Sequence, residues 1–301
     1  MKIVVFGAGS LGSLVGGLLA RDHDVTLVAR EAHARTVRES GLRLEGVVDG
    51  PSRVSPAATT DGTGLEADLA VVTVKSFDTA AAADALATGS IEAVLSLQNG
   101  MGNEATLATR IEAPVLAGTA TYGAILQEPG VVECTGSGEI VLGPRDGGSS
   151  ARAERVGETF AAAGLETTVA DDMPRRLWEK LAVNAGINPI TALTATENGA
   201  VLEEPATDLA REATRETARV ARACDVSLSN REALAAMETV AKATAANTSS
   251  MAQDLAAQRR TEIDAINGYV VERAVENGLE VPTNRTLTAL IRTWEQGRGR
   301  R

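Results

Sequence analysis

The chain has 301 residues, of which 44% are hydrophobic and only 2% aromatic, so it is long enough for two ordinary domains with aliphatic cores. Its net charge of −11 leaves no basic stripe to neutralise phosphates, which excludes a nucleic-acid backbone as partner. No apolar run approaches the roughly 20 residues that span a membrane. The apolar start at residues 3–6 leads into glycines and not into a signal-peptide core, so we expect a cytoplasmic protein.

The cysteines and histidines are not spaced for a disulfide framework or a metal. Cys134 and Cys224 lie far apart and outside any C-x-x-C pair, so we expect two unpaired thiols. His23 and His33 have no nearby Cys or His in the sequence, so we expect no metal site.

Strands and helices alternate in the first half of the chain. An apolar run at residues 3–6, glycines at 7–12, a helical stretch at 14–20 and a second strand at 24–29 predict a βαβ unit. Further apolar runs lie at residues 69–74, 93–97 and 115–117. Because these runs are almost wholly apolar, we expect parallel strands that are covered on both faces by helices.

A hairpin is predicted at the edge of this sheet. Residues 131–133 and 139–142 are strand-like, and Gly136-Ser137-Gly138 separates them. Glycines between two short apolar runs are typical of an antiparallel turn.

The character of the chain changes after Asp171-Asp172-Met173-Pro174. Residues 204–225 and 231–268 are rich in Ala, Glu, Arg and Thr at helical spacing and predict long helices. The predicted fold is therefore α/β, with an N-terminal Rossmann-type doubly wound sheet followed by an all-helical C-terminal domain. We expect a dinucleotide-binding domain over residues 1–172 and a substrate-binding and catalytic domain over residues 173–301.

The glycine loop Gly7-Ala8-Gly9-Ser10-Leu11-Gly12 predicts a dinucleotide site, because it follows a strand and opens a helix. Gly7 permits a tight turn, Gly9 lets the backbone approach a pyrophosphate, and Gly12 lets the helix pack closely on the strand. The first N–H groups of the helix would bind the phosphates. The alternative is an ordinary glycine turn in a flavodoxin-like fold.

The residue after the second strand predicts which cofactor is used. NAD enzymes usually place a carboxylate there for the ribose 2′-hydroxyl, whereas this chain has Arg30. A guanidinium can hold a 2′-phosphate with two hydrogen bonds, so we expect NADPH. Glu31, one residue on, is the competing ribose ligand and would make NADH the cofactor.

Two other strand ends carry polar residues. Lys75 follows one apolar run and Asn99 follows another. Because ligands bind beyond the carboxyl ends of parallel strands, we expect both beside the cofactor. A solvated charge and a plain Asn-Gly turn are the alternatives.

Two polar groups stand out in the second half. Lys180, Asn184 and Asn188 are spaced by four residues, so on a helix they share one face among apolar neighbours. A helix through the region that follows would place Asn247, Ser250 and Glu262 along one side. Singly, each is more typical of a capping or surface residue, but together they suit a site for a small keto acid.

These motifs resemble those of the ketopantoate reductase (2-dehydropantoate 2-reductase) family over essentially the whole chain. The stretches that carry the resemblance are the glycine loop, Gln98-Asn99-Gly100-Met101-Gly102, Trp178-Glu179-Lys180-Leu181-Ala182-Val183-Asn184, Ile187-Asn188-Pro189-Ile190-Thr191-Ala192, Asn198-Gly199, Asn247-x-Ser249-Ser250-Met251-x-Gln253-Asp254 and Thr261-Glu262-Ile263-Asp264-x-Ile266-Asn267-Gly268. The last two are the most specific, because the glycine loop is common to many unrelated dehydrogenases.

The resemblance implies NADPH-dependent reduction of ketopantoate to pantoate, a step of pantothenate and coenzyme A biosynthesis. It makes Lys180 the proton donor to the keto oxygen and Glu262 its assistant. The implied substrate-binding residues are Asn184, Asn188, Asn198, Asn247 and Ser250. Lys75 and Asn99 would flank the nicotinamide ribose. The sequence leaves the oligomeric state open, with a homodimer as one alternative.

The chemistry agrees with a lysine at the reaction centre. Hydride addition to a ketone builds negative charge on its oxygen, which a positioned ammonium stabilises and then protonates. Arginine would hold its proton too tightly. The competing interpretations are another NAD(P)-dependent 2-keto or 3-hydroxy acid reductase and a non-catalytic NADP-binding regulator. A regulator has no need of both Lys180 and Glu262.

Overall fold

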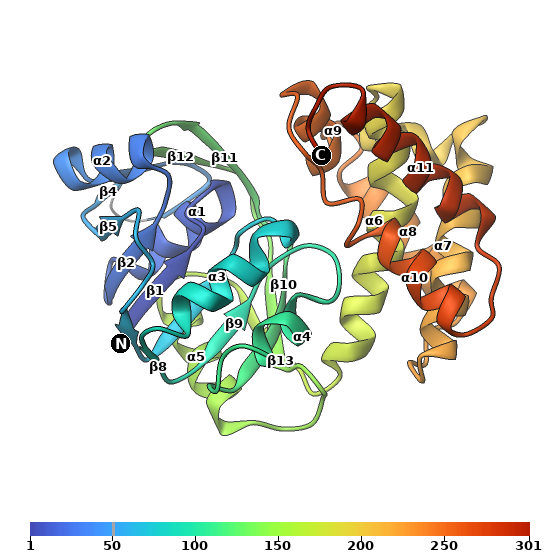
Figure 1. Ribbon diagram of the computed structural model, residues 1–301. Coiled ribbons are helices and arrows are strands. Elements are labelled where there is room, and N and C mark those ends of the chain that lie inside the picture. Colours follow the sequence, from blue (N-terminus) through green and yellow to red (C-terminus); the bar gives the residue numbers. More distant parts are fainter. Residues whose placement is uncertain (50–51) are drawn as a thin grey trace. The chain divides into compact units, whose positions relative to one another are not determined.

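The computed structural model describes residues 1–49 and 52–301, which fall into two compact units (Figure 1). The sheet unit consists of Met1–Gln98 and Asn103–Met173. The helical unit consists of Pro174–Arg301 together with the short segment Asn99–Gly102. A segment from the first half of the chain therefore packs with the second half.

The sheet unit is built on one large sheet, in which the strand order is β14-β13-β10-β9-β7-β1-β2-β5. Its strands are β1 (Lys2–Phe6), β2 (Asp24–Val28), β5 (Ala57–Thr59), β7 (Leu69–Val72), β9 (Val94–Ser96), β10 (Val115–Ala120), β13 (Ile140–Pro144) and β14 (Thr167–Val169). The six strands from β5 to β10 are parallel, and their order is that of a doubly wound dinucleotide-binding sheet. The predicted fold class is confirmed.

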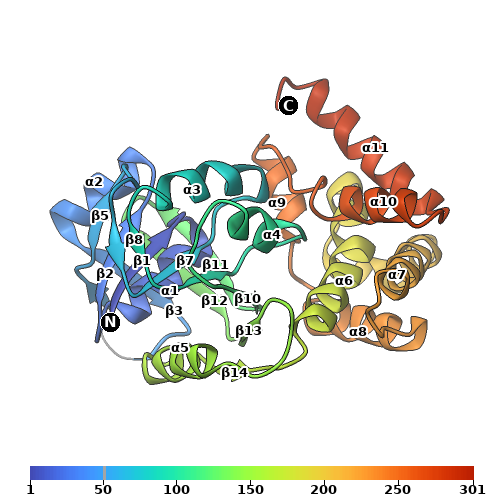
Figure 2. The same cartoon turned by 60° about the horizontal axis from the view of Figure 1, so that its bottom comes forward.

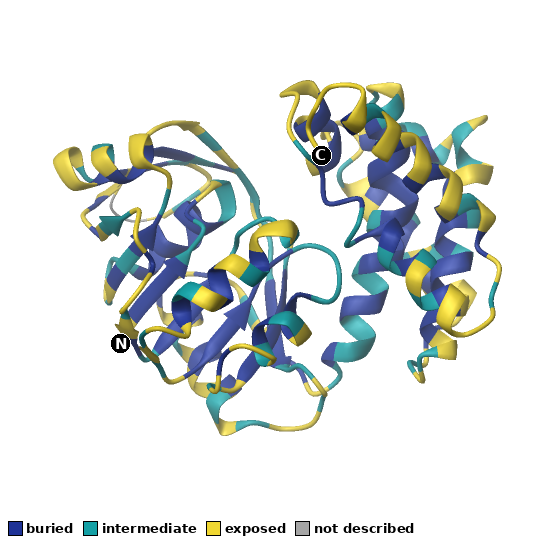
Figure 3. Ribbon diagram, viewed as in Figure 1, coloured by how far each residue is buried: buried dark blue, intermediate teal, exposed yellow. Residues whose placement is uncertain are grey.

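Alternation along β1 explains why this sheet has two covered faces. Ile3 and Val5 belong to a core shared with α1 (Ser10–Leu19) and α5 (Ala151–Ala162), while Val4 belongs to a core on the other face. The second core takes in residues of α3 (Thr79–Leu86) and α4 (Asn103–Ala108). Figure 2 shows α3 and α4 on one face of the sheet and α5 on the other, and Figure 3 shows the strands between them as buried.

The predicted hairpin at residues 131–142 is wrong. A second sheet, in the order β11-β12-β3-β4, contains β12 (Val131–Gly136), whereas β13 pairs with β10 and β14 in the large sheet. The other strands of the second sheet are β3 (Leu42–Gly46), β4 (Arg53–Val54) and β11 (Gly123–Glu128). The turn falls instead at Pro129-Gly130, where Gly130 has a φ of 82°. Residues 136–138 carry the chain between sheets.

The second sheet packs against α1. A Cβ at Gly17 would lie 2.6 Å from Leu44 Cδ2, so the helix presents a flat glycine surface to β3. His33, on α2 (Glu31–Ser40), is buried beside this contact: its Nδ1 accepts from the Gly130 N–H (2.9 Å) and its Nε2 lies 3.0 Å from the Ser13 hydroxyl. A small parallel pair, β6 (Glu66–Ala67) and β8 (Ser90–Ile91), completes the strands.

The helical unit contains six α-helices in its described residues and one short 3-10 helix. They are α6 (Met173–Thr194), the 3-10 helix at Asn198–Leu202, α7 (Ala206–Ala223), α8 (Asn230–Ala243), α9 (Ser250–Ala256), α10 (Asn267–Glu276) and α11 (Pro282–Gln296). Their apolar faces form two cores, one around Trp178 and Ile263 and one around Val183 and Met237. Among the described residues, no helix is long and apolar enough to cross a membrane.

The prediction of one long helix over residues 231–268 is wrong, because the chain breaks twice. Ser249 accepts the Ala252 N–H (3.2 Å) and so starts α9 with a new cap after a loop of poor helix formers. After α9, Gln258 adopts a φ of 51°, which ends the helix, and turns lead to α10.

Candidate active site

The glycine loop joins β1 to α1 and is held against the end of β2. The N–H groups of Gly7 and Ala8 both donate to the Val28 carbonyl, at 3.0 and 2.9 Å. A Cβ at Gly12 would lie 2.5 Å from the Thr73 hydroxyl, so only glycine fits there. A Cβ at Gly9 would approach nothing closer than 3.9 Å, so this α-carbon faces open space.

The N-terminus of α1 offers hydrogen-bond donors beside this open side. The first helical bond runs from the Ser13 N–H to the Gly9 carbonyl (2.9 Å), so the helix does not use the N–H groups of Ser10–Gly12. The Ser10 hydroxyl accepts the Leu126 N–H of β11 (3.1 Å), which fixes its direction. Backbone N–H groups that the helix does not use, at the positive end of its dipole, suit a pyrophosphate.

Arg30 and Glu31 differ in what they contact. Arg30 is exposed and is the N-cap residue of α2, two residues after the end of β2. The Glu31 carboxylate accepts a hydrogen bond from Arg38 (3.2 Å), and Arg38 also donates to the Ala58 carbonyl. Glu31 is thus engaged along its own helix, which is the difference in contacts between these two candidates for the ribose.

A buried network orients the segment that carries Lys75. Gln98, two residues after the end of β9, donates from Nε2 to the Val74 carbonyl (3.0 Å) and to the Thr79 hydroxyl (2.7 Å). Lys75 is half-buried between these anchors and caps a 3-10 turn at Ser76–Asp78. Gln98 and Thr79 were not among the predicted site residues, although a glutamine at the end of an apolar strand was a signal for them.

Asn99 lies in the helical unit, in a segment packed on the turn that carries Glu262. The Met101 N–H donates to the Ala265 carbonyl (2.9 Å), and a Cβ at Gly100 would lie 2.6 Å from the Ala265 Cβ. The Ala265 N–H in turn donates to the Glu262 carbonyl (3.0 Å). The structure therefore brings the segment of Asn99 to the turn of Glu262, two positions that are distant in the sequence.

The predicted polar face of α6 is present as a row of three side chains. Lys180, Asn184 and Asn188 lie one turn apart within this helix. Lys180 and Asn184 are half-buried, and Asn188 is buried. A long cation and two amides at partly desolvated positions on one helix face are groups that can bind a polar ligand.

One contact connects α6 to the loop before α9, and a second connects the 3-10 helix at Asn198–Leu202 to that loop. The hydroxyls of Thr191 and Ser249 lie 2.8 Å apart. The Asn198 N–H donates to the Asn247 carbonyl (2.9 Å). Ser250, the first residue of α9, and Asn247 are both exposed at this junction. The structure thus brings the Asn247 and Ser250 segment to α6 through a loop, and not along one helix as expected.

Asn198 itself is buried. Its Nδ2 donates to the Thr244 hydroxyl (3.0 Å), while its Oδ1 has no hydrogen-bond partner within residues 1–49 and 52–301. The Asn198 side chain is therefore held by Thr244, and its Oδ1 can still accept a hydrogen bond.

Glu262 is buried in the turns between α9 and α10, not on a helix. The preceding residue, Thr261, donates its N–H (2.8 Å) and its hydroxyl (2.7 Å) to the carboxylate of Glu295, which is fully buried on α11. The Glu295 carboxylate also accepts from Arg301 (2.9 Å). Glu295 was missed from the sequence, because a glutamate in an amphipathic helix looks like a surface residue.

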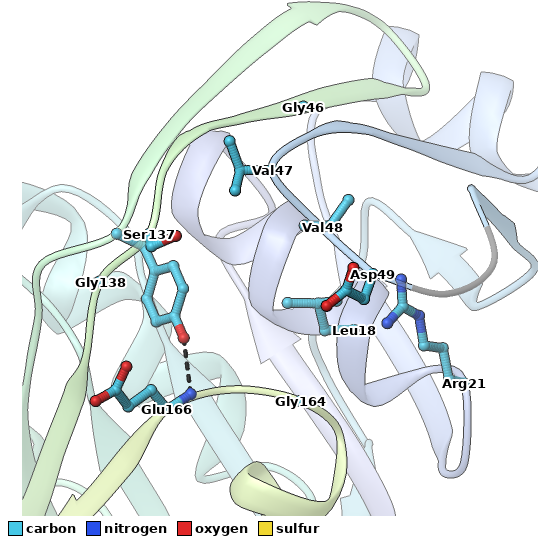
Figure 4. Close-up of a pocket in the computed structure, with 11 residues that line it drawn as sticks. Leu18, Arg21, Gly46, Val47, Val48, Asp49, Ser137, Gly138, Gly164 and Glu166 are labelled. Carbon is cyan, nitrogen blue, oxygen red and sulfur yellow. Dashed lines mark hydrogen bonds between the residues drawn. The ribbon is translucent and has the colours of Figure 1, made fainter.

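A separate hollow of about 420 Å³ lies elsewhere on the sheet unit (Figure 4). Leu18, Val47 and Val48 give it apolar walls, and at one side the Glu166 N–H donates to the Tyr122 hydroxyl (2.7 Å). It contains neither the glycine loop nor Arg30, so it is distinct from the candidate site.

In the described part of the chain, no three His, Cys, Asp or Glu side chains lie together in a group that could hold a metal ion. Cys134 and Cys224 are unpaired, as expected, and burial raises the pKa of both thiols.

A doubly wound sheet with a glycine loop, joined in sequence to a helical unit with partly buried polar side chains, is the architecture of two-domain dinucleotide-dependent oxidoreductases. Residues 3–147 match the family described as ketopantoate reductase PanE/ApbA, and residues 172–295 match the C-terminal region of the same family. The chain belongs to the PanE/ApbA ketopantoate reductase family, and the resemblance seen in the sequence is confirmed.

Individual relatives agree over their full lengths. The curated 2-dehydropantoate 2-reductase of Halobacterium salinarum is 47% identical over 299 residues, which cover 97% of this chain and 98% of the relative. The crystal structure of a PanE/ApbA family ketopantoate reductase from Ralstonia eutropha JMP134 has a TM-score of 0.91 and 36% identity, covering 99% of this chain and 100% of that one. A D-mandelate dehydrogenase with NADH has a TM-score of 0.92 over 100% of both chains, but at 23% identity it shows the fold alone.

Proposed function

We propose that this protein is a 2-dehydropantoate 2-reductase, which reduces ketopantoate to pantoate with NADPH in pantothenate and coenzyme A biosynthesis. The observation that carries the proposal is the 47% identity, over nearly the whole of both chains, to a curated enzyme of that name. Matches to both parts of the family support it, because a regulator that had kept only cofactor binding would not need the second.

In this proposal the two domains bind different molecules. Residues 1–172 bind the dinucleotide, and residues 173–301 bind the keto acid and hold the catalytic groups. The polar face of α6, the Asn247 and Ser250 junction and the turn of Glu262 all belong to the helical unit, which supports the assignment.

The residues of the sheet unit fit the cofactor. Gly7–Gly12 would hold the pyrophosphate on the open side of Gly9, and Arg30 would hold the 2′-phosphate. Lys75 of the sheet unit, and Asn99 from the short segment that packs with the helical unit, would contact the nicotinamide ribose. NADPH, when bound, supplies the hydride.

The residues of the helical unit would orient the ketone and provide the proton. Asn184, Asn188 and Asn247 bind the substrate's hydroxyl end, Ser250 binds its carboxylate, and Asn198 adds a polar contact. As the hydride adds to the keto carbon, the C=O π electrons move to oxygen, and the ammonium of Lys180 stabilises that charge. Lys180 then gives its proton to the oxygen and becomes neutral, and it regains a proton from solvent. Glu262 holds the ammonium in position.

The test is NADPH oxidation with a panel of 2-keto acids. Ketopantoate should have the highest kcat/KM, with ketoisovalerate and phenylglyoxylate as competitors that lack its hydroxyl group. Faster turnover of another keto acid, or no turnover of ketopantoate by a protein that binds NADPH, would contradict the proposal. Gly9→Leu serves as the control, because it fills the open side of the loop and should abolish NADPH binding.

A further inference from the structure

A proline interrupts the hydrogen-bond ladder of α6 within the candidate site. Pro189 lies inside the helix, directly after Asn188. Because proline has no N–H, the carbonyl four residues earlier, that of Ala185, loses its helical donor, and the proline ring also crowds that carbonyl. Ala185 is itself buried, so its carbonyl needs a donor from elsewhere in the protein.

Asn267 supplies the missing donor. Its Nδ2 donates to the Ala185 carbonyl at 3.1 Å, and its side chain is 0% exposed at the start of α10. The same Nδ2 donates to Asn284 Oδ1 at 2.9 Å. Both amide hydrogens are used, whereas Asn267 Oδ1 is buried without a hydrogen-bond partner in the described ranges. A buried carbonyl left unpaired is unfavourable, so the contribution of this side chain is its donation.

The orientation of the Asn267 amide is fixed by a chain of buried contacts. Asn284 donates from Nδ2 to Glu216 Oε2 (2.8 Å) and to the Ala213 carbonyl (3.0 Å), so its Oδ1 must face Asn267. Glu216 is fully buried on α7 and also accepts the N–H groups of Thr283 and Asn284, both at 2.9 Å. An acceptor facing Asn267 requires that its NH₂ group points inward.

We infer that Asn267 is a positioning residue for the substrate: by replacing the hydrogen bond that Pro189 removes, it fixes the path of α6 at this proline and so the placement of Asn188 relative to Lys180 and Asn184. This inference rests on the proposed function. Kinks at proline depend on what satisfies the freed carbonyl. Without the donor, the Ala185 carbonyl would be buried and unpaired, and the turn between residues 185 and 189 would shift to reach another partner.

The test is a double-mutant cycle between Asn267→Leu and Pro189→Ala, with KM and kcat measured for ketopantoate. Leucine has a similar shape and no donor, whereas alanine at 189 restores the N–H that Ala185 lacks. Asn267→Leu should raise the ketopantoate KM about tenfold in the presence of Pro189 and less than about twofold when residue 189 is alanine, as expected for coupled neighbours. The NADPH KM should not change, because the glycine loop and Arg30 are untouched.

Thr217→Val is the matched control. Thr217 is fully buried on α7 and donates to the Ala213 carbonyl (2.9 Å), which keeps Asn284 Nδ2 (3.0 Å) as a donor, so this variant loses a buried hydrogen bond of the same network without removing the donation of Asn267 to α6. It should alter the melting temperature and leave the ketopantoate KM unchanged. If Asn267→Leu does not fold, Pro189→Ala should restore its folding.

Three results would overturn the inference: an unchanged KM in Asn267→Leu, the same KM increase in both backgrounds, or a folding defect that Pro189→Ala does not relieve. Failure of the proposed function is distinguished by the wild type, which would then not turn over ketopantoate in the same assay. The cycle can in that case still be evaluated from the unfolding free energies of the four proteins.

Discussion

The hydroxyl oxygens of Thr191 and Ser249 lie 2.8 Å apart, and these residues are 0% and 5% exposed. Thr191 follows Asn188 by three residues on α6, and Ser249 is the cap that starts α9 at Ser250. One buried hydrogen bond thus joins the two segments to which we assign substrate binding. A contact that is sheltered from water in this way fixes a distance as well as contributing stability.

Thr191→Val should therefore weaken substrate binding. Valine has the same shape but cannot bond to Ser249, so the loop of Asn247 and Ser250 loses its anchor on α6. We expect the ketopantoate KM to rise several-fold and the unfolding free energy to fall by about 1 kcal/mol, the usual value of one such bond. Steady-state kinetics and urea unfolding measure both quantities.

Thr194→Val provides the comparison for that variant. The Thr194 hydroxyl donates to the Ile190 carbonyl of its own helix (2.8 Å) and does not contact Ser249. It should change stability slightly and leave the KM alone. Equal KM values for wild type and Thr191→Val would show that the contact is only structural.

The arrangement of the large sheet could be predicted because its strands are apolar on both faces and are punctuated by glycines. The second sheet could not, because its strands pair across long sequence separations: β12 pairs with β3, more than 80 residues earlier. Nothing local distinguishes that pairing from a hairpin with β13, since both arrangements bury the same alternate residues, such as Val132 and Ile140.

The site could be predicted where it depends on local spacing. Lys180, Asn184 and Asn188 share a face because any helix places i, i+4 and i+8 together. Asn267 and Glu295 could not be found, since their roles depend on which carbonyl or hydroxyl lies opposite them in the folded unit. The break before α9 was missed because the Ala- and Thr-rich composition around Asn247 was taken as continuous helix.

Arg30→Ala should raise the KM for NADPH and leave that for NADH nearly unchanged, because only NADPH carries the 2′-phosphate. A charge-assisted hydrogen bond contributes ~1.5–3 kcal/mol, which corresponds to a change of about 10–100-fold. Arg35→Ala, an exposed arginine on the same helix, is the control. If the wild type uses NADH as well as NADPH, the assignment fails and Glu31 becomes the ribose ligand.

Ketopantoate should exceed ketoisovalerate in kcat/KM by orders of magnitude. A site that binds a hydroxyl leaves its buried amides unpaired when the hydroxyl is missing. Such sites discriminate against the substrate that lacks the hydroxyl by ~10⁴–10⁵-fold. Asn188→Ala should narrow the ratio between the two substrates, whereas Asn277→Ala, an exposed asparagine at the end of α10, should not. Comparable rates for both substrates in the wild type would refute recognition of the hydroxyl.

The His33 ring should make the stability of the sheet unit depend on pH. Because Nδ1 accepts from the Gly130 N–H, the ring is neutral, and burial lowers its pKa below the ordinary value of 6.5. As the pH falls, the unfolded chain takes up the proton before the folded one does. The contribution of the neutral His33 ring to the unfolding free energy is therefore fully present above pH 6.5, and it is lost as the pH falls from there toward the lower folded pKa.

Unfolding free energies at about pH 7.5 and about pH 5.5 test this effect. The pKa of His23 is also lowered by burial, so the wild type alone does not isolate His33. His33→Asn keeps an acceptor for Gly130 but does not titrate in this range, and its stability should therefore fall less between the two pH values. Identical losses in both proteins would assign the dependence to other groups.

Lys180→Ala is the most direct test of the mechanism. If the ammonium protonates the keto oxygen, its contact strengthens as charge develops in the transition state, so its removal should chiefly lower kcat. General acid catalysis typically contributes about 10²–10⁴-fold, and we expect a decrease of that size. NADPH binding should persist, which fluorescence titration of the folded variant measures.

Two further variants separate a proton donor from a simple charge. Lys180→Arg keeps the positive charge but holds its proton too tightly, so it should not restore kcat. Lys242→Ala removes an exposed lysine from α8 and should leave turnover unchanged. A surface lysine that only forms an ion pair contributes less than about 1 kcal/mol to stability and nothing to kcat. Near-normal kcat in Lys180→Ala, or full rescue by arginine, would therefore remove Lys180 as the proton donor.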